Sequence, residues 1–138
     1  MRLWHKDLIE VLPNKMLVSQ WRELSAIVGY INKNGSLNHR LVNIIEDYKK
    51  IDLYIYTKKI YNEMKKRNMN PSEKVLEKIT KYTNIHINNK EDIFVNWHNK
   101  RYLKQCFHNL EEKYDRNIIN KKEWELIASK YKKINENI

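Results

Sequence analysis

Residues 16–29 read MLVSQWRELSAIVG, and this stretch predicts a helix with one apolar face. Pro13 suits a first helical turn and Asn34-Gly35 is a stop signal, so we expect a helix over residues 13–32. Its apolar side chains recur at steps of four and three residues, the spacing of one helix face, and they are Leu17, Trp21, Leu24, Val28 and Ile31. Gly29 lies inside this helix, which indicates close packing against another element.

The remaining periodic segments also predict helices, and no segment has the alternation of a strand. We expect helices over residues 52–68, 72–82, 95–114 and 121–133, a short helix or extended segment over 41–45, and a surface loop over 83–91. Only two glycines and two prolines are present, so long linkers are not expected. The sequence therefore predicts an all-α fold, a single domain over residues 1–138 with its N-terminal segment packed against the helices.

The charge of the chain favours a polyanionic partner. Lysine and arginine number 27 against 17 acidic residues, for a net charge of +10. Such a surface suits nucleic acid better than a membrane, although some of these lysines could simply be solvated surface. No apolar run approaches the roughly 18 residues of a membrane span, and no signal peptide follows residue 1. Cys106 is the only cysteine, which fits a reducing cytoplasm and a small core residue rather than a catalytic thiol.

Several common catalytic motifs are missing from the sequence. It contains no Gly-rich phosphate loop, no zinc-spaced Cys/His set and no nucleophile elbow, and its five histidines are scattered. Any catalysis is therefore expected to need neither a metal nor a cofactor.

The first octet, MRLWHKDL, places large side chains where chain ends usually fray. This pattern indicates that the N-terminus is held in place and belongs to the working site. In the helix over residues 13–32, steps of 100° put Met16, Gln20, Glu23 and Ile27 on one shoulder of the apolar stripe. Partial desolvation there would raise the pKa of the Glu23 carboxyl and suit proton transfer. Helix geometry alone favours the alternative, a boundary glutamate paired with a lysine or arginine.

Three stretches of the chain resemble the pyrimidine-dimer DNA glycosylase family: MRLWHKDL, LPNKMLVSQWRELSAIVG and YNEMKKRNMNPS. The resemblance implies a helical fold whose N-terminus approaches the centre of the molecule. It also implies a DNA N-glycosylase coupled to an abasic-site lyase, with the α-amine of the first residue as nucleophile. Glu23 matches the catalytic glutamate of the family, and this match outweighs the ion-pair alternative.

The resemblance also implies a nucleophile and two DNA contacts. Met1 falls on the position of the nucleophile, and we expect it to be retained because Arg2 is too large for methionine excision. Arg2 and Arg22 match DNA-contacting arginines of the family. His39 and Arg40 are further candidates for DNA contact.

The last predicted helix adds candidate phosphate contacts, but the resemblance weakens there. Lys121 and Lys122 are basic residues suited to phosphate, as are further lysines of this helix. Ala26 replaces an arginine of the phage enzymes, and their C-terminal aromatic cluster is reduced here to a sparser set around Trp124 and Tyr131. The chemistry is therefore predicted more firmly than the lesion.

Together these features predict a repair enzyme that acts as a monomer on lesion-containing double-stranded DNA. We expect a cytoplasmic protein of a bacterium or phage, associated with the nucleoid. Two other functions remain open. A non-catalytic basic helical module would bind DNA or RNA without needing an ordered terminus, and a helical protein–protein adaptor would show weak salt dependence.

Overall fold

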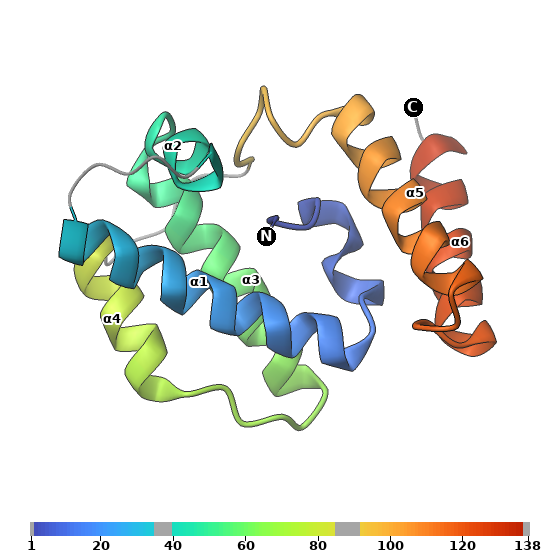
Figure 1. Ribbon diagram of the computed structural model, residues 1–138, viewed down its shortest axis with the longest axis horizontal. Coiled ribbons are helices and arrows are strands. Elements are labelled where there is room, and N and C mark those ends of the chain that lie inside the picture. The colour runs from blue at the N-terminus through green and yellow to red at the C-terminus, as the bar shows by residue number, and fades with distance from the viewer. Residues whose placement is uncertain (1, 35–39, 85–91, 137–138) are drawn as a thin grey trace.

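The computed structural model describes residues 2–34, 40–84 and 92–136. All regular elements in these ranges are helices, which confirms the predicted all-α fold. They are the 3-10 helix η1 (Lys6–Val11) and the α-helices α1 (Asn14–Asn34), α2 (Arg40–Glu46), α3 (Lys50–Lys66), α4 (Glu73–Thr83), α5 (Lys100–Asp115) and α6 (Lys121–Glu136). Figure 1 shows α1 to α4 on one side of the molecule and the α5–α6 pair on the other.

Helix α1 buries the apolar stripe that its sequence predicts. Leu17, Trp21, Leu24 and Val28 are buried, and Ile31 is partly buried against the core. The helix packs on α3 and α4. Gly29 faces Lys78 of α4, whose Nζ atom lies 2.9 Å from where a Cβ at residue 29 would stand. This ammonium group donates to the Ser25 carbonyl oxygen at 2.9 Å, so the missing side chain makes room for a link between α1 and α4.

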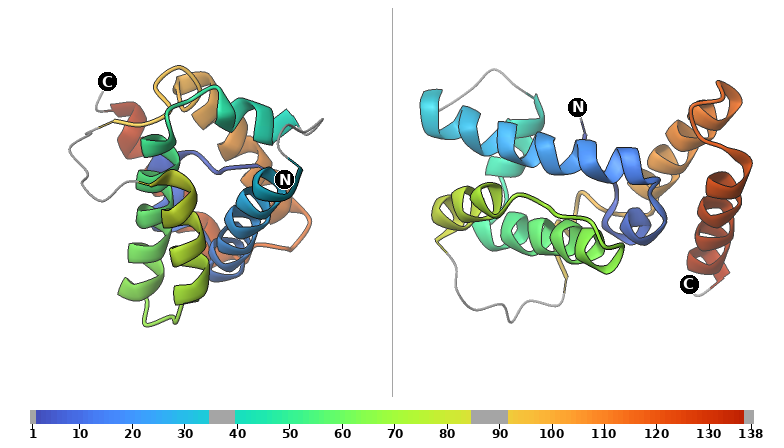
Figure 2. Two further views of the ribbon diagram at one scale, coloured as in Figure 1. Left: turned by 90° about the vertical axis from the view of Figure 1, so that its left-hand side faces the viewer. Right: turned by 90° about the horizontal axis from the view of Figure 1, so that it is seen from below.

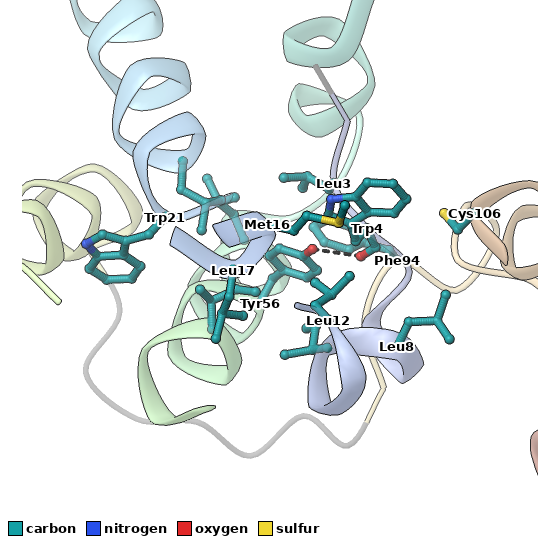
Figure 3. Close-up of a cluster of buried hydrophobic side chains, with 14 of the residues drawn as sticks. Leu3, Trp4, Leu8, Leu12, Met16, Leu17, Trp21, Tyr56, Phe94 and Cys106 are labelled. Atoms are coloured by element: carbon teal, nitrogen blue, oxygen red, sulfur yellow. Dashed lines mark hydrogen bonds between the residues drawn. The ribbon is translucent and has the colours of Figure 1, made fainter. Parts of the chain in front are cut away.

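The N-terminal segment runs through the middle of the molecule, between α1 and α3 on one side and the α5–α6 pair on the other (Figures 1 and 2). Leu3, Leu8 and Leu12 are almost completely buried, so the start of the chain contributes to the hydrophobic core. Figure 3 shows these side chains in one cluster with residues of the helices. The structure thus confirms the prediction that this segment packs against the helices.

The α5–α6 pair is joined by aromatic stacking. The rings of Phe107 and Tyr131 lie 3.9 Å apart at 5°, and those of Tyr114 and Trp124 lie 5.3 Å apart at 8°. Helix α6 also contacts η1, where Lys130 Nζ lies 3.2 Å from the Glu10 carboxylate. The two helices therefore pack on each other, and α6 also packs on the N-terminal segment.

The helix predicted from residue 95 begins later, at Lys100. Residues 94–99 form turns, and Phe94 has a positive φ of 50°. The Asn99 side chain accepts from the Tyr102 N–H at 2.9 Å and caps α5, which sets the start of the helix. Asp52 of α3 accepts from the Phe94 N–H at 3.1 Å and holds the turn in place. The segment over 41–45 belongs to a helix, α2. The ends of the other predicted helices shift by at most three residues, and the last helix begins at Lys121 as predicted. The loop predicted over 83–91 lies mostly outside the described residues.

Arg67 at the end of α3 clamps the corner between η1 and α1. Its guanidinium donates to the carbonyl oxygens of Leu12 at 2.6 Å and Glu10 at 2.9 Å, and to Asn14 Oδ1 at 2.9 Å. Glu63 accepts from its Nε at 2.9 Å, one helical turn away. Carbonyls at the end of a short helix lack partners of their own, and a planar fork can satisfy several of them at once.

We expect Arg67→Lys to lower the free energy of unfolding by about 2 kcal/mol, because one ammonium group cannot bond all these acceptors at once and the partly buried bond to the Leu12 carbonyl is weakened. Urea unfolding followed by circular dichroism measures this loss. The matched control is Arg116→Lys, since Arg116 is an exposed residue that follows α5 as Arg67 follows α3. Equal stability of the two variants would contradict the clamp.

Candidate active site

Three helices hold the backbone of residues 2–4 through side-chain hydrogen bonds. Gln20 of α1 donates to the Arg2 carbonyl at 3.0 Å, Tyr102 of α5 to the Leu3 carbonyl at 2.6 Å, and Tyr56 of α3 to the Trp4 carbonyl at 2.7 Å. Figure 3 shows the Tyr56 hydroxyl pointing at the Trp4 carbonyl. Chain ends are rarely ordered unless they are tied down, and here three consecutive carbonyls are tied to three different elements.

Gln20 is the centre of this network. It is completely buried, and its Oε1 atom accepts from the Trp4 N–H at 2.8 Å. A backbone N–H can only donate, so the amide oxygen must face it and the amide nitrogen must face the other way. That nitrogen donates to the Arg2 carbonyl and to Glu23 Oε2, both at 3.0 Å. One side chain therefore links the start of the chain to the carboxylate of Glu23.

Glu23 lies at the boundary between core and solvent, as its place on the helix predicts. Met16 and Ile27 on the same shoulder are buried, while Glu23 is only partly buried. Burial raises the pKa of the Glu23 carboxyl above its ordinary value. A carboxyl of this kind takes up a proton more readily than an exposed glutamate, which suits proton transfer.

The two tyrosines of the network remain protonated donors. Burial raises the pKa of Tyr56 well above its ordinary value and is also the main cause of the raised pKa of Tyr102. At neutral pH these hydroxyls are therefore uncharged and donate to the backbone carbonyls.

Residues of the turn before α5 complete the site, and local sequence patterns do not reveal them. His98 is buried, and its Nδ1 atom accepts from the Lys6 N–H at 3.0 Å. Its ring lies 5.1 Å from that of His5, and burial lowers the pKa of His98 to about 2. Cys106 is buried as predicted, with a thiol pKa that burial raises, so it fits the core and not a reactive thiol.

Two of the predicted DNA-contacting residues share one groove. Arg2 and Arg40 both line a cavity of about 450 Å³ between α2 and α5, which we call the α2–α5 groove. The Arg2 guanidinium carbon lies 5.5 Å from the centre of the Trp4 ring. Tyr102 also lines this groove, so it adjoins the hydrogen bonds that hold the N-terminal segment.

The structure does not gather the other predicted residues at this groove. Arg22 is exposed on α1, next to Glu23 in the sequence. Lys121 and Lys122 are exposed at the start of α6, and no bond of the network above involves that helix. Met1 and His39 lie outside the described residues.

Within residues 2–34, 40–84 and 92–136, no three His, Cys, Asp or Glu side chains are grouped so that they could hold a metal ion. In the same ranges, none of the helices combines the length and the apolar character needed to span a bilayer.

Comparison with known proteins identifies one family. The family model described as pyrimidine dimer DNA glycosylase matches residues 1–77, which include Glu23, Gln20 and the Arg67 clamp. No significantly similar curated protein and no significantly similar solved structure was found. The turn before α5, with His98, and both C-terminal helices lie beyond the matched residues.

We expect Glu23→Gln to raise the melting temperature at pH 7. A carboxyl whose pKa is raised on folding costs stability when ionised, and this cost grows as pH rises from the unfolded value of 4.5 through the folded value. Glutamine keeps an acceptor for Gln20 without the charge. The gain should vanish below about pH 4, where glutamate is neutral in both states. Thermal unfolding of the two proteins across pH 3.5–8 tests this, and a gain independent of pH would contradict it.

Proposed function

The chain belongs to the pyrimidine dimer DNA glycosylase family, and on that premise we propose that it excises damaged pyrimidines and then cleaves the abasic strand with its N-terminal α-amine. Membership of the family makes it a DNA repair glycosylase, with DNA as its substrate. The lyase step and the roles of individual residues are our proposal. The observation that carries it is the Gln20 amide nitrogen, which donates to both the Arg2 carbonyl and Glu23.

The proposal is supported by the short distance that the chain allows between the α-amine of Met1 and the Glu23 carboxylate. Met1 directly precedes Arg2, and neighbouring Cα atoms are about 3.8 Å apart, so an Arg2 carbonyl held beside Glu23 limits how far the terminal amine can lie from that carboxylate. An amine and a carboxylate held together supply a nucleophile and a group that moves protons. Imine formation at a sugar and the elimination that follows need both of these functions.

An α-amine suits the task better than a lysine. Its reference pKa is about 7.7–8.0 against about 10.4 for lysine, so its neutral fraction is roughly 400-fold larger near pH 7. Only the neutral amine has a free electron pair for attack. A terminus that is held in place therefore provides a nucleophile without a buried lysine.

The proposed reaction has two stages. The amine attacks C1′ of the damaged nucleotide, the bond between C1′ and the base breaks, and the base leaves with the bonding electrons. Loss of the amine proton and opening of the sugar ring then give an imine between Met1 and C1′. Removal of a C2′ proton expels the 3′ phosphate and cuts the strand. The Glu23 carboxylate stabilises positive charge on the sugar and carries protons between these steps.

The basic residues around this pair are proposed to hold the duplex. Arg2 and Arg40 at the α2–α5 groove, with exposed Arg22 beside Glu23, provide planar forks for phosphate. Lys121 and Lys122 would contact the backbone further away, and His39 keeps its predicted role in DNA contact. Action as a monomer in the cytoplasm, at the nucleoid of a bacterium or phage-infected cell, stays a prediction.

We expect borohydride to trap a covalent complex between untagged protein and duplexes carrying a thymine dimer or an abasic site. A variant with extra residues before Met1 should form none, because its α-amine is displaced. Glu23→Gln should slow trapping by about 100-fold or more, the usual scale for loss of a proton-transfer group. Denaturing gels of labelled DNA measure the band. DNA binding without any band would favour the non-catalytic binding module.

We expect Gln20→Glu to move the acidic limb of the trapping rate to higher pH. The new carboxylate can still accept from the Trp4 N–H, but it cannot donate to Arg2 or Glu23. A second negative charge beside Glu23 raises the pKa of that carboxyl further. Ile79→Val is the control, since Ile79 is a buried apolar residue of α4. If Gln20→Glu slows trapping but leaves its pH profile unchanged, the role of Gln20 is purely structural.

A further inference from the structure

The peptide unit between Leu3 and Trp4 bridges two helices that are far apart in the sequence. Its N–H donates to Gln20 Oε1 of α1 at 2.8 Å, and its carbonyl oxygen accepts from the Tyr102 hydroxyl of α5 at 2.6 Å. The carbonyl and the N–H of a trans peptide point in opposite directions, so the two helices hold this unit from opposite sides. Figure 1 shows the first residues passing between α1 and α5.

The preceding peptide unit is held as well, because Gln20 Nε2 donates to the Arg2 carbonyl at 3.0 Å. A peptide unit is planar, so bonds at both of its ends fix its orientation. With two successive units held, only the rotations at Arg2 and Met1 separate this point from the terminal amine. The direction in which the amine points therefore depends on Tyr102 as well as on Gln20.

A second contact comes from the same side of the segment. His98, which lies just before α5, accepts from the Lys6 N–H with its Nδ1 atom at 3.0 Å. The rings of His98 and Tyr102 pack together, with their centres 5.1 Å apart. The α5 side thus holds the N-terminal segment at two places, the carbonyl of residue 3 and the N–H of residue 6.

Both of these side chains project from an anchored backbone. The Asn99 side chain accepts from the Tyr102 N–H at 2.9 Å, and the Phe94 carbonyl accepts from the His98 N–H at 2.7 Å. The Phe94 N–H in turn donates to Asp52 of α3 at 3.1 Å. The hydroxyl and the imidazole are therefore preorganised, and little conformational entropy is lost when they hold the segment.

We propose that Tyr102 and His98 are positioning residues of the strand-cleaving step, which fix from the α5 side the direction of the terminal amine toward the sugar. The inference rests on the proposed function and extends it to a part of the chain beyond residues 1–77. Neither side chain needs to touch the reacting atoms. Misplacing a reacting group by about 1 Å can slow a reaction by about 100-fold, so loss of either contact should lower the rate of cleavage and leave DNA affinity unchanged.

Tyr102→Phe tests the first contact, because it keeps the ring and its packing but removes the donor to the Leu3 carbonyl. The matched control is Tyr114→Phe, since Tyr114 is a partly buried tyrosine of the same helix whose ring stacks on Trp124 of α6. Untagged proteins in excess cleave a labelled duplex with one abasic site, which gives the maximal rate and the half-saturating protein concentration. At saturating protein, an unfolded fraction does not alter the maximal rate.

We expect Tyr102→Phe to lower the maximal rate by about tenfold, the scale of one hydrogen bond, and to leave the half-saturating concentration unchanged. Tyr114→Phe should change neither. An unchanged maximal rate in Tyr102→Phe would overturn the proposal. So would a change confined to the half-saturating concentration, which would make Tyr102 a DNA-binding residue.

Two substitutions of His98 separate its hydrogen bond from its bulk. His98→Asn places a carbonyl oxygen on Cγ, where histidine has Nδ1, so it can still accept from the Lys6 N–H. His98→Leu is similar in size to asparagine but has no acceptor. We expect His98→Leu to lower the maximal rate and His98→Asn to restore most of this loss. Equal rates in the two variants would overturn the role of His98.

Hydrogen exchange of the Trp4 N–H tests the hold on the segment without any chemistry. This N–H belongs to the same peptide unit as the Leu3 carbonyl, so Tyr102→Phe should speed its exchange by about tenfold, and Tyr114→Phe should not. Unchanged exchange in Tyr102→Phe would overturn the proposal whatever the cleavage rates. If the wild-type protein cleaves no abasic DNA, the amine mechanism is rejected, and faster exchange in Tyr102→Phe still supports Tyr102 as the residue that holds the segment.

Discussion

The rest of the site depends on the hydrogen bonds made by the carboxamide of Gln20. Its oxygen accepts from the Trp4 N–H, and its nitrogen donates to the Arg2 carbonyl and to Glu23. A buried amide with all these bonds formed is rigid, since the loss of any one leaves a polar group unpaired in the core. The beginning of the chain is thereby tied to the carboxylate of α1, and Tyr56 and Tyr102 tie the next two carbonyls to α3 and α5.

This arrangement places the segment that carries Leu3, Leu8 and Leu12 inside the core instead of at the surface. Leu3 and Leu8 are buried with the apolar residues of the helices, and the Arg67 fork fixes the corner where the segment turns into α1. Apolar burial and hydrogen bonding therefore act on the same few residues. The family match over residues 1–77 covers this framework, and the α5 residues that close it lie beyond the match.

The position of Glu23 balances two requirements. Glu23 is buried enough for the pKa of its carboxyl to be raised, which favours proton uptake. Its side chain is only partly buried, so it also remains accessible from solvent. Its ionised form is disfavoured in the folded protein, and this cost is a feature that active sites commonly share. The α2–α5 groove combines arginines with aromatic rings, and it shares Arg2 and Tyr102 with the hydrogen-bond network of the N-terminal segment.

The sequence by itself determined the helices and the shoulder position of Glu23, because both depend on neighbours three or four residues away along one helix. The large residues of the first octet also predicted that the N-terminal segment packs against the helices. Only the tertiary structure decided that helix α5 begins at Lys100, that His98 meets Lys6, and that Trp97, Arg2 and Arg40 share a groove. Residues 6 and 98 are 92 positions apart. Contacts over such distances come from the packing of whole helices, which leaves no periodic trace in the local sequence.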